Sequence, residues 1–315
     1  MSLFTSLRYL VALHHHKHFG RAAEACHVTQ PALSNAIRAL EKEFGTAIVK
    51  RGRAFESFTP EGEQIFRTAQ RMLHEQELLR QSLQSAEGAP TGTLSLGAVP
   101  SVMPIAARFT GMLQKQFAGI RVVLRSMSSQ ELEAGLENLS LDLALGYMDR
   151  IQTARATLTT LWQYNEHYFL LRRAHQASAE GLRIRTHTCG WADAATERLC
   201  LLTPEMHNRT IVDDAFRQAG LQPGPVIETN SILALGLSVL AGDVCSVLPG
   251  ALVGVLSGYG ELEAVPLNAP EVLTPIGLIY TNTQQPSHTL NAALRFASSP
   301  AWASHVKSHS GLLRA

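Results

Sequence analysis

The feature that most constrains the fold is a stretch near the N-terminus, residues 19–45, which reads FGRAAEACHVTQPALSNAIRALEKEFG. Apolar residues recur in it at spacings of four, three and four: Leu33, Ile37, Leu40 and Phe44. This period predicts a helix over residues 30–44 that turns those four side chains inward. Thr29 is placed to cap the helix, and Pro31 falls in its first turn, where a missing N–H costs little. A shorter helix over residues 21–26 precedes it across a tight turn.

The opposite face of the same helix is polar. Its outward side chains are Gln30, Ser34, Asn35 and Arg38. Side chains of these types can hydrogen-bond base edges and phosphates, and a helix that displays them fits the major groove of DNA. The same pattern also fits an ordinary solvated helix face. The helix by itself leaves both interpretations open.

A long polar helix is predicted over residues 59–87, with Thr59 as its N-cap. Its seam residues alternate at spacings of four and three: Ile65, Ala69, Met72, Gln76, Leu79 and Leu83. A seam of this kind is typical of a helix that pairs with another helix. The stretch EGAPTG at residues 87–92 then breaks the helix and supplies a hinge.

The rest of the chain alternates short apolar runs with helical patterns. Strands are predicted at TLSLGAV (93), IRVVLRSM (120), LDLALGYM (141), HYFLLRR (167), RLCLLT (198), VCSVLPG (244) and TPIGLIY (274). Amphipathic helices are predicted between them, among others at residues 104–117, 208–219 and 231–241. This alternation indicates βαβ units and a mainly parallel sheet.

Charge is distributed unevenly along the chain. Residues 1–58 hold eight Lys and Arg against four Asp and Glu, a net charge of +4, whereas the whole chain carries +1, which leaves about −3 for residues 59–315. A small basic module on a near-neutral body suggests a polyanionic partner.

The four cysteines have no metal-ligand spacing, so reduced thiols and a cytoplasmic location are expected. Neither an export leader nor a stretch that would span a membrane is recognised, so no membrane partner is expected.

The motif LRYLVAL…FGRAAEACHVTQPALSNAIRALEKEFGTAIVKRG…FTPEGEQI resembles the winged helix-turn-helix of LysR-type transcriptional regulators. The resemblance covers about sixty residues in order and spacing, and the long helix and the α/β body extend it to nearly the whole chain. It implies an α/β fold with an N-terminal all-α winged helix-turn-helix and a two-lobed effector domain like periplasmic solute-binding proteins.

The resemblance also implies a division of the chain. The expected domains are a DNA-binding head at 1–58, a dimerisation helix at 59–88 and an effector domain at 92–300. Lobe I would take residues 92–162 and 268–300, and lobe II residues 163–267. The crossovers between the lobes would lie near Leu161–Tyr164 and Val265–Asn268.

Double-stranded DNA is the first partner that the resemblance implies. Carried over by position, the DNA-binding residues are Arg21, Thr29, Gln30, Pro31, Ser34, Asn35 and Arg38 in the helix-turn-helix, with Arg51 and Arg53 in the wing. Three positions depart from the family pattern. Gly20 replaces a usual Ser or Thr, which removes a cap on the second helix, Asn35 replaces a frequent basic residue, and Val49 replaces a frequent Phe.

A small-molecule effector is the second implied partner. Its expected contacts are Ser101, Ser128, Ser129, Thr203, Met206, His207 and Asn230, although each serine also fits plain helix capping. Hydroxyls and helix N-termini, with Arg209 nearby, favour a small carboxylate. Formate or a related acid is the working suggestion, because Met103 and Met206 would leave a small site. RNA polymerase and a homodimer or homotetramer complete the expected partners.

Other functions have weaker support in the sequence. Peroxide-sensing relatives carry a reactive cysteine where this chain has His207, which argues against a redox switch; a metal- or redox-responsive regulator of the same fold is the alternative. No enzyme motif is present, so neither a catalytic residue nor a cofactor is expected. The histidine-rich run at residues 14–18, with Cys26 and His27, raises the question of a metal site. A first helix that ends near His16 favours mostly exposed histidines, some of them facing phosphate, which could tune DNA affinity with pH.

Overall fold

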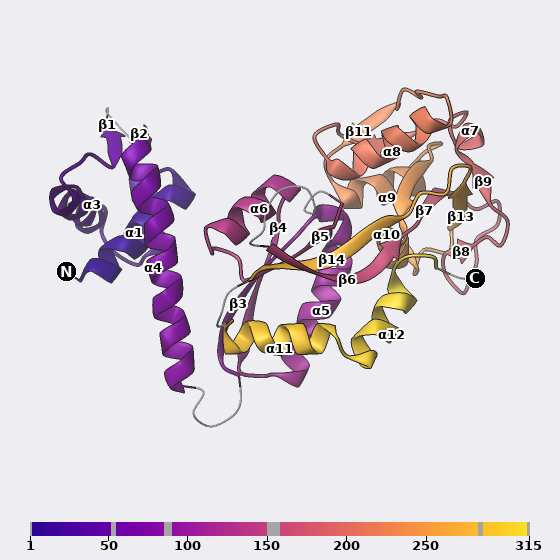
Figure 1. The fold of residues 1–315 in the computed structure, drawn as a ribbon. Coiled ribbons are helices and arrows are strands. Elements are labelled where there is room, and N and C mark those ends of the chain that lie inside the picture. Colours follow the sequence, from indigo (N-terminus) through magenta and orange to yellow (C-terminus); the bar gives the residue numbers. More distant parts are fainter. Residues whose placement is uncertain (1, 52–54, 85–89, 150–157, 283–285, 314–315) are drawn as a thin grey trace. The chain divides into compact units, whose positions relative to one another are not determined.

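The computed structural model describes residues 2–51, 55–84, 90–149, 158–282 and 286–313 (Figure 1). The chain forms two compact units, the first made up chiefly of the N-terminal 88 residues and the second of most of the remainder. No helix in the described ranges is both long enough and apolar enough to cross a bilayer.

The first unit is a helical head with one long helix. Its elements are α1 (Leu3–His16), α2 (Phe19–Ala25), α3 (Gln30–Phe44), β1 (Val49–Arg51), β2 (Phe55–Phe58) and α4 (Pro60–Gln84). The Oγ1 of Thr29 accepts a hydrogen bond from the Ala32 N–H, so the expected cap of α3 is confirmed. Leu33, Ile37 and Leu40 are buried in the head core as expected. Phe44 is not, because it lies in the final turn, where the helix leaves the core, and its side chain is 45% exposed.

Gly62 fixes how α4 begins. A Cβ atom at this position would lie 2.1 Å from the carbonyl oxygen of Ile48, a distance that no side chain can adopt. The Thr59 hydroxyl accepts the Gly62 N–H at 2.8 Å and donates to the Ala47 carbonyl. Thr59 therefore caps α4 as predicted and also joins its start to the strand pair β1–β2.

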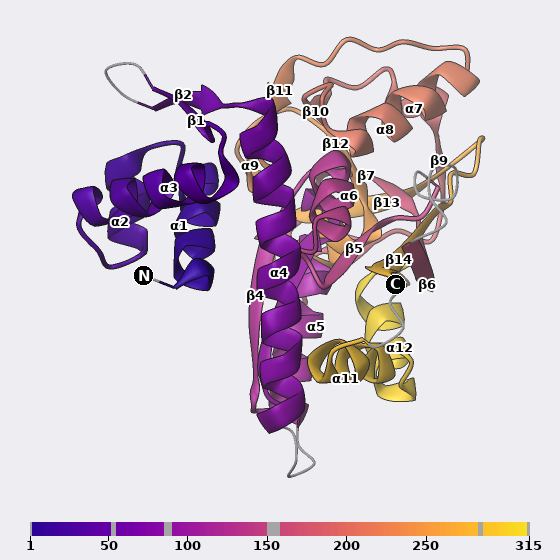
Figure 2. The ribbon, with the colours of Figure 1, turned by 60° about the vertical axis from the view of Figure 1, so that its left-hand side comes forward.

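The two halves of α4 have different surroundings. Phe66 and Ala69 in the first half are buried, and Ala69 belongs to the head core. The second half runs beyond the three head helices (Figure 2). There Met72, Leu79 and Leu83 of the expected seam stay exposed within their own unit, spaced seven and four residues apart. The first half of α4 is thus a core helix of the head, and its second half carries an exposed apolar stripe.

The second unit has two lobes. Lobe I contains a five-stranded sheet in the order β4-β3-β5-β14-β6, in which β3 pairs parallel with β4 and β5, and β14 pairs antiparallel with β5 and β6. Its elements are β3 (Gly92–Ala98), η2 (Pro100–Val102), α5 (Met103–Gln116), β4 (Ile120–Ser126), α6 (Ser129–Glu137), β5 (Leu143–Tyr147), β6 (Leu158–Glu166), β14 (Thr274–Thr281), α11 (His288–Ala297) and α12 (Pro300–His309). Phe109 of α5, Phe296 of α11 and Trp302 of α12 pack against one another in its core.

Lobe II is built on the sheet β12-β7-β13-β8, with β9 beside β13 and a separate parallel pair β10–β11. Its elements are β7 (Tyr168–Arg173), β8 (Arg183–Ile184), β9 (Cys189–Gly190), α7 (Trp191–Ala194), β10 (Cys200–Leu202), α8 (His207–Gln218), β11 (Ile227–Thr229), α9 (Ile232–Ala241), β12 (Ser246–Pro249), α10 (Gly250–Val253), η3 (Gly254–Leu256) and β13 (Leu262–Asn268). Side chains of β7 alternate between two cores, with Phe169 and Leu171 in the one that includes α9 and Tyr168 and Leu170 in the one that includes α8. Each face of the strand is therefore covered by a helix.

The prediction of a mainly parallel sheet is only partly right, because both main sheets of this unit are mixed. In lobe I, β3 pairs parallel with β4 and β5, but β14 pairs antiparallel with β5 and β6. In lobe II, β7 pairs antiparallel with both β12 and β13. The physical reason is that the chain passes between the lobes twice, so that strands after a crossing run back along their neighbours. The structure puts the crossings between β6 and β7 and between β13 and β14, a few residues later than expected.

The C-terminal segment also joins both lobes. Trp302 and Val306 of α12 are buried in the core of lobe I, beyond the expected domain end at residue 300. A few residues later, Leu313 is buried in one core of lobe II. The described chain thus has a third connection between the lobes.

A buried carboxyl group holds this connection. Glu166, the last residue of β6, is 2% exposed, and its Oε1 accepts hydrogen bonds from the N–H of Gly311 at 2.9 Å and of Ala251 at 3.3 Å. Its Oε2 has no hydrogen-bond partner among the described residues. Burial raises the pKa of Glu166 to about 7, although the hydrogen bonds from Gly311 and Ala251 act in the opposite direction.

The raised pKa predicts a pH-dependent stability of the second unit. The folded state binds the Glu166 proton more tightly than the unfolded state, so this contribution is full below about pH 4.5 and is lost as pH rises through about 7. The wild-type free energy of unfolding should fall by about 3 kcal/mol between pH 4.5 and pH 8 because of Glu166. Replacing Glu166 with Gln should abolish this fall. All three tryptophans lie in this unit, so denaturation followed by tryptophan fluorescence reports on it. Equal pH profiles for wild type and E166Q would contradict the expectation.

Candidate functional sites

The polar face of α3 is available on the surface of the head. Gln30, Pro31, Asn35 and Arg38 are exposed, and Ser34 is half-buried. The Arg38 guanidinium donates to the Asn35 Oδ1 at 3.3 Å, which holds these two side chains together one turn apart. A helix with such a face, packed behind a shorter helix across a tight turn, is a helix-turn-helix.

The other candidate DNA contacts lie around this helix. Arg21 on α2 and Thr29 before α3 are exposed. The strand pair β1–β2 occupies the place of the wing, and Arg51 is the last residue of β1. Arg53 falls outside the described residues. The roles of these residues on DNA remain predictions.

The histidine run is split by a helix end, as expected. α1 ends at His16, and Lys17 in the left-handed region closes it. His15, His16 and His18 are exposed, but His14 is not: its ring stacks on Phe66 at 3.6 Å between centroids, and its Nε2 lies 3.2 Å from the Glu63 Oε2. Burial lowers the pKa of His14. Within the described ranges, no three His, Cys, Asp or Glu side chains are grouped as a metal site would need.

A cavity of about 320 Å³ opens where the lobes of the second unit meet. It is lined by Val99, Pro100, Ser101, Ser128, Ser129, Gln130, Tyr147, Glu205, Met206, His207 and Asn208. The lobe I residues follow the carboxyl ends of β3, β4 and β5, and the lobe II residues form the start of α8. Carboxyl ends of strands are where α/β sheets bind ligands.

A buried polar network forms the floor of this cavity. The Tyr147 hydroxyl lies 2.6 Å from the Ser101 Oγ and accepts from the Asn208 Nδ2 at 3.3 Å. The same Asn208 nitrogen donates to the Tyr168 hydroxyl, also at 3.3 Å. Burial raises the pKa of Tyr147 to about 12, so the phenol stays protonated. The network therefore joins lobe I to lobe II by neutral hydrogen bonds.

Two polar atoms at the cavity lack partners. The Ser129 Oγ and the His207 Nε2 are buried with no hydrogen-bond partner among the described residues. The same His207 nitrogen lies 3.9 Å from the Asp149 Oδ2, and the His207 ring meets the Tyr147 ring edge to face. Helix α8 also begins without a side-chain cap. The Ser129 hydroxyl, the start of α8 and the His207 Nε2, which has only the longer contact with Asp149, can hydrogen-bond a ligand that supplies matching atoms.

The effector-binding residues that the sequence predicted divide into two groups. Ser101, Ser128, Ser129, Met206 and His207 come together at the cavity. Thr203 and Asn230 are not part of its lining, and the Thr203 hydroxyl donates to Glu205 instead.

The Ser128 Oγ accepts a hydrogen bond from the Glu131 N–H at 3.3 Å, so this serine also caps α6, and its N–H and hydroxyl donate to the Glu131 carboxylate. Sequence reasoning missed Tyr147 and Asn208. The position of Tyr147 at the end of a predicted strand was the signal that could have indicated it.

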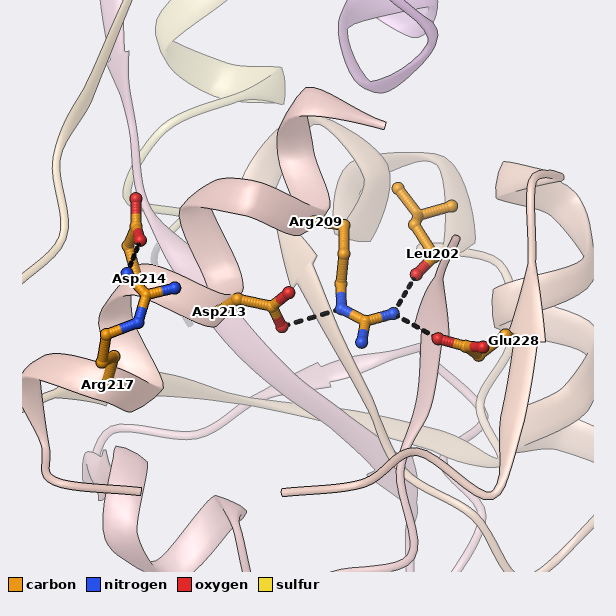
Figure 3. A network of polar contacts seen from close by, with 6 residues as sticks. All are labelled: Leu202, Arg209, Asp213, Asp214, Arg217 and Glu228. Atoms are coloured by element: carbon orange, nitrogen blue, oxygen red, sulfur yellow. Dashed lines mark hydrogen bonds and ion pairs between the residues drawn. The ribbon is translucent and has the colours of Figure 1, made fainter. Parts of the chain in front are cut away.

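Arg209 does not supply a positive charge to the cavity, contrary to the sequence-based expectation. Its side chain is 10% exposed, and the Nε donates to Asp213 at 2.7 Å while the Nη1 donates to the Glu228 Oε1 at 2.7 Å and to the Leu202 carbonyl. Figure 3 shows this guanidinium enclosed between α8 and the strand pair β10–β11. It ties the first turn of α8, which carries His207 and Asn208, to the rest of lobe II.

The cysteines lie away from the cavity lining, and their thiols are weakly acidic. Cys200 and Cys245 are buried, as predicted, and Cys26 and Cys189 are half-buried. Burial raises the pKa of all four thiols, that of Cys245 to about 11. Few of them exist as the reactive thiolate at neutral pH.

A helix-turn-helix head and a two-lobed α/β domain with a small-molecule cavity define a ligand-responsive DNA-binding regulator. Residues 4–63 match the bacterial regulatory helix-turn-helix protein, lysR family, and residues 87–299 match the LysR substrate binding domain. The chain therefore belongs to the LysR family of transcriptional regulators, which are not enzymes. The expected fold class is confirmed.

Individual relatives agree along most of the chain. It is 28% identical over 275 residues to a hydrogen peroxide-inducible genes activator of Dickeya chrysanthemi, covering 87% of this chain and 88% of the relative. It is 25% identical over 290 residues to the regulator BenM of Acinetobacter baylyi, covering 90% and 91%.

Solved structures are similar over the same span. A full-length variant of OxyR from Pseudomonas aeruginosa is 25% identical, with a TM-score of 0.67 and coverage of 94% of this chain and 97% of that one. CbnR complexed with its target DNA, at 20% identity, has a TM-score of 0.65, with coverage of 94% and 99%, and shares the fold.

The contacts of Arg209 predict that it stabilises lobe II. Replacing Arg209 with Met leaves two carboxylates and a carbonyl without their donor and should lower the unfolding free energy by about 1–3 kcal/mol. Arg217, also on α8 and paired with Asp214, is 60% exposed and provides the matched control. Because exposed pairs contribute about 0–1 kcal/mol, R217M should change little. Denaturation followed by tryptophan fluorescence compares the two, and equal losses would contradict the assignment.

Proposed function

We propose that this LysR-family regulator binds DNA through α3 and responds to a small carboxylate that also carries a hydrogen-bond donor. The single observation that carries the ligand class is the set of unsatisfied groups at the cavity. The uncapped start of α8 and the free Ser129 hydroxyl suit a carboxylate, since helix N-termini favour anions. The Glu205 carboxylate in the lining suits a hydroxyl or ammonium group on the same ligand.

The cavity size refines the sequence-based suggestion of formate. A volume of about 320 Å³ is near the lower end of the usual range for ligand sites and holds roughly ten water volumes. Met103 is absent from its lining, so only Met206 narrows it. An acid larger than formate therefore fits better.

The proposed mechanism is a shift between two arrangements of the lobes. The buried network of Ser101, Tyr147 and Asn208 joins the lobes beneath the ligand, so a ligand that contacts both would favour one arrangement. The exposed stripe of Met72, Leu79 and Leu83 on α4 supports a homodimer or homotetramer through which the DNA-binding heads are spaced. Contact with RNA polymerase and action in the cytoplasm belong to the same proposal. So does the division into a DNA-binding head, a dimerisation helix and an effector domain, with the effector domain extended to include the buried Trp302, Val306 and Leu313.

The DNA-binding part predicts a specific effect at α3. Replacing Arg38 with Ala should weaken binding to the DNA upstream of the protein's own gene about tenfold or more, because a charged contact to phosphate or base is lost. Lys42 is the matched control, because it lies in the last turn of α3, away from the N-terminal part of the helix that meets base edges, and K42A should stay within about twofold. Gel shifts at fixed salt measure both, and equal losses would mean that only net charge matters.

The effector part predicts a ligand preference. Hydroxy- and amino-carboxylates should raise the melting temperature by several degrees at concentrations far above their Kd, because only the folded state binds them. Their amide counterparts should not. The S129A and H207A variants should lose the shift, and N230A, whose side chain lies outside the lining, should keep it. Equal shifts with acids and amides would rule out carboxylate recognition.

Response to hydrogen peroxide is the second candidate, and the names of several relatives favour it. The raised thiol pKa values and the absence of cysteine from the cavity lining oppose it, because peroxide oxidises the thiolate. Peroxide should therefore leave DNA binding unchanged in the same assay. A change that disappears when a cysteine is replaced would favour the second candidate.

A further inference from the structure

His18 occupies an unusual place for a histidine, the N-cap of α2. Its backbone is extended, with φ −156° and ψ 123°, and its Nδ1 accepts a hydrogen bond from the Arg21 N–H at 3.2 Å. The preferred residues at such a position are Ser, Thr, Asp and Asn, whose oxygen atoms accept the same bond. The N-cap position of this helix is residue 18 and not residue 20, and the imidazole fills it, so the expected loss of a cap at Gly20 is corrected.

This bond determines which ring nitrogen carries the proton. A neutral imidazole has one donor and one acceptor nitrogen, and Nδ1 is here the acceptor. The proton is therefore on Nε2. Because His18 is exposed, its Nε2–H is a donor on the surface of the head.

Gly20 makes room for the ring beside the recognition helix. A Cβ atom at Gly20 would lie 3.1 Å from the His18 Cε1 and 3.3 Å from its Nδ1. It would also lie 3.7 Å from the Oε1 of Gln30, the first residue of α3. The imidazole and the start of α3 thus share one corner of the head.

We propose that His18 is a DNA-contacting residue of this chain, whose Nε2–H donates to a backbone phosphate next to the position that Gln30 reaches. In a helix-turn-helix the recognition helix presents its N-terminal residues to base edges while the preceding helix crosses the backbone. The His18 Nε2–H lies at the start of α2, the preceding helix, and next to Gln30, the first residue of the recognition helix α3. It is therefore close both to the part of the head that crosses the DNA backbone and to the part that meets the bases. The proposal rests on the proposed placement of α3 on DNA.

The contact is made by an uncharged donor. An imidazolium has protons on both nitrogens and could not accept the Arg21 N–H, so capping and positive charge exclude each other at this residue. Phosphate hydrogen bonds from neutral groups position a protein on DNA without releasing counterions as a cation does. This distinguishes His18 from the arginines of the same surface.

The test compares H18S and H18A with wild type on a duplex taken from upstream of the protein's own gene, in gel shifts at one fixed pH over a series of salt concentrations. Serine keeps the cap but does not reach outward, and alanine loses both. We expect both variants to bind about three- to tenfold more weakly, with the salt dependence of wild type. Only H18A should speed hydrogen exchange at residues 19–25.

Each alternative result has a distinct meaning. Wild-type affinity in H18S would overturn the proposal and leave His18 as a cap only. A salt dependence reduced by about one unit in H18S would overturn the uncharged contact. Failure of the wild-type protein to bind the duplex would contradict DNA binding itself, and the proposal with it.

Gly20 supplies an independent check through a double-mutant cycle. G20A must displace the His18 ring by a few tenths of an ångström and should weaken DNA binding in the wild-type background. In the H18S background the ring is absent, and the same change should have no effect. Alanine favours a helix more than glycine does, so loss of α2 would not explain a weakening. Equal effects in both backgrounds would overturn the proposal.

Discussion

The buried carboxyl group of Glu166 is the constraint on which the second unit depends. It lies where the chain leaves lobe I, and its Oε1 accepts N–H groups from Ala251 in lobe II and from Gly311 near the C-terminus. One side chain thereby joins a crossing strand, a helix start and the segment that carries Leu313 into lobe II. A carboxyl group in this place remains only because its hydrogen bonds offset much of the cost of burial.

The crossings between the lobes determine which groups meet at the cavity and can bind a ligand. Tyr147 and Asn208 meet beneath it from opposite lobes, so the floor is a hydrogen-bonded contact and not a gap. Arg209 is used to hold α8 in place, which leaves the binding of an anion to helix dipoles and hydroxyls. The same arrangement explains why Arg209, although next to Asn208 in the sequence, is paired with two carboxylates and is not part of the cavity lining.

The DNA-binding head follows a similar logic on a smaller scale. Gly62 and Thr59 fix the start of α4 against the strand pair, and His14 packs on the same helix. Caps made by Thr29 and His18 fix the starts of α3 and α2. These local contacts orient the exposed face of α3, so the surface for DNA depends also on residues such as Gly62 and His14, which are not among the candidate DNA contacts.

The sequence alone determined what depends on neighbours along the chain. The bounds of α3, its cap at Thr29 and the start of α4 follow from helix periodicity and capping chemistry, which act within a few residues. The tertiary structure decided what depends on distant partners. It buried His14 against Phe66, exposed Phe44, turned Arg209 toward Glu228 and made the crossings into antiparallel strands. Burial, charge pairing and strand direction are set by groups far away in the sequence, and no local pattern contains them.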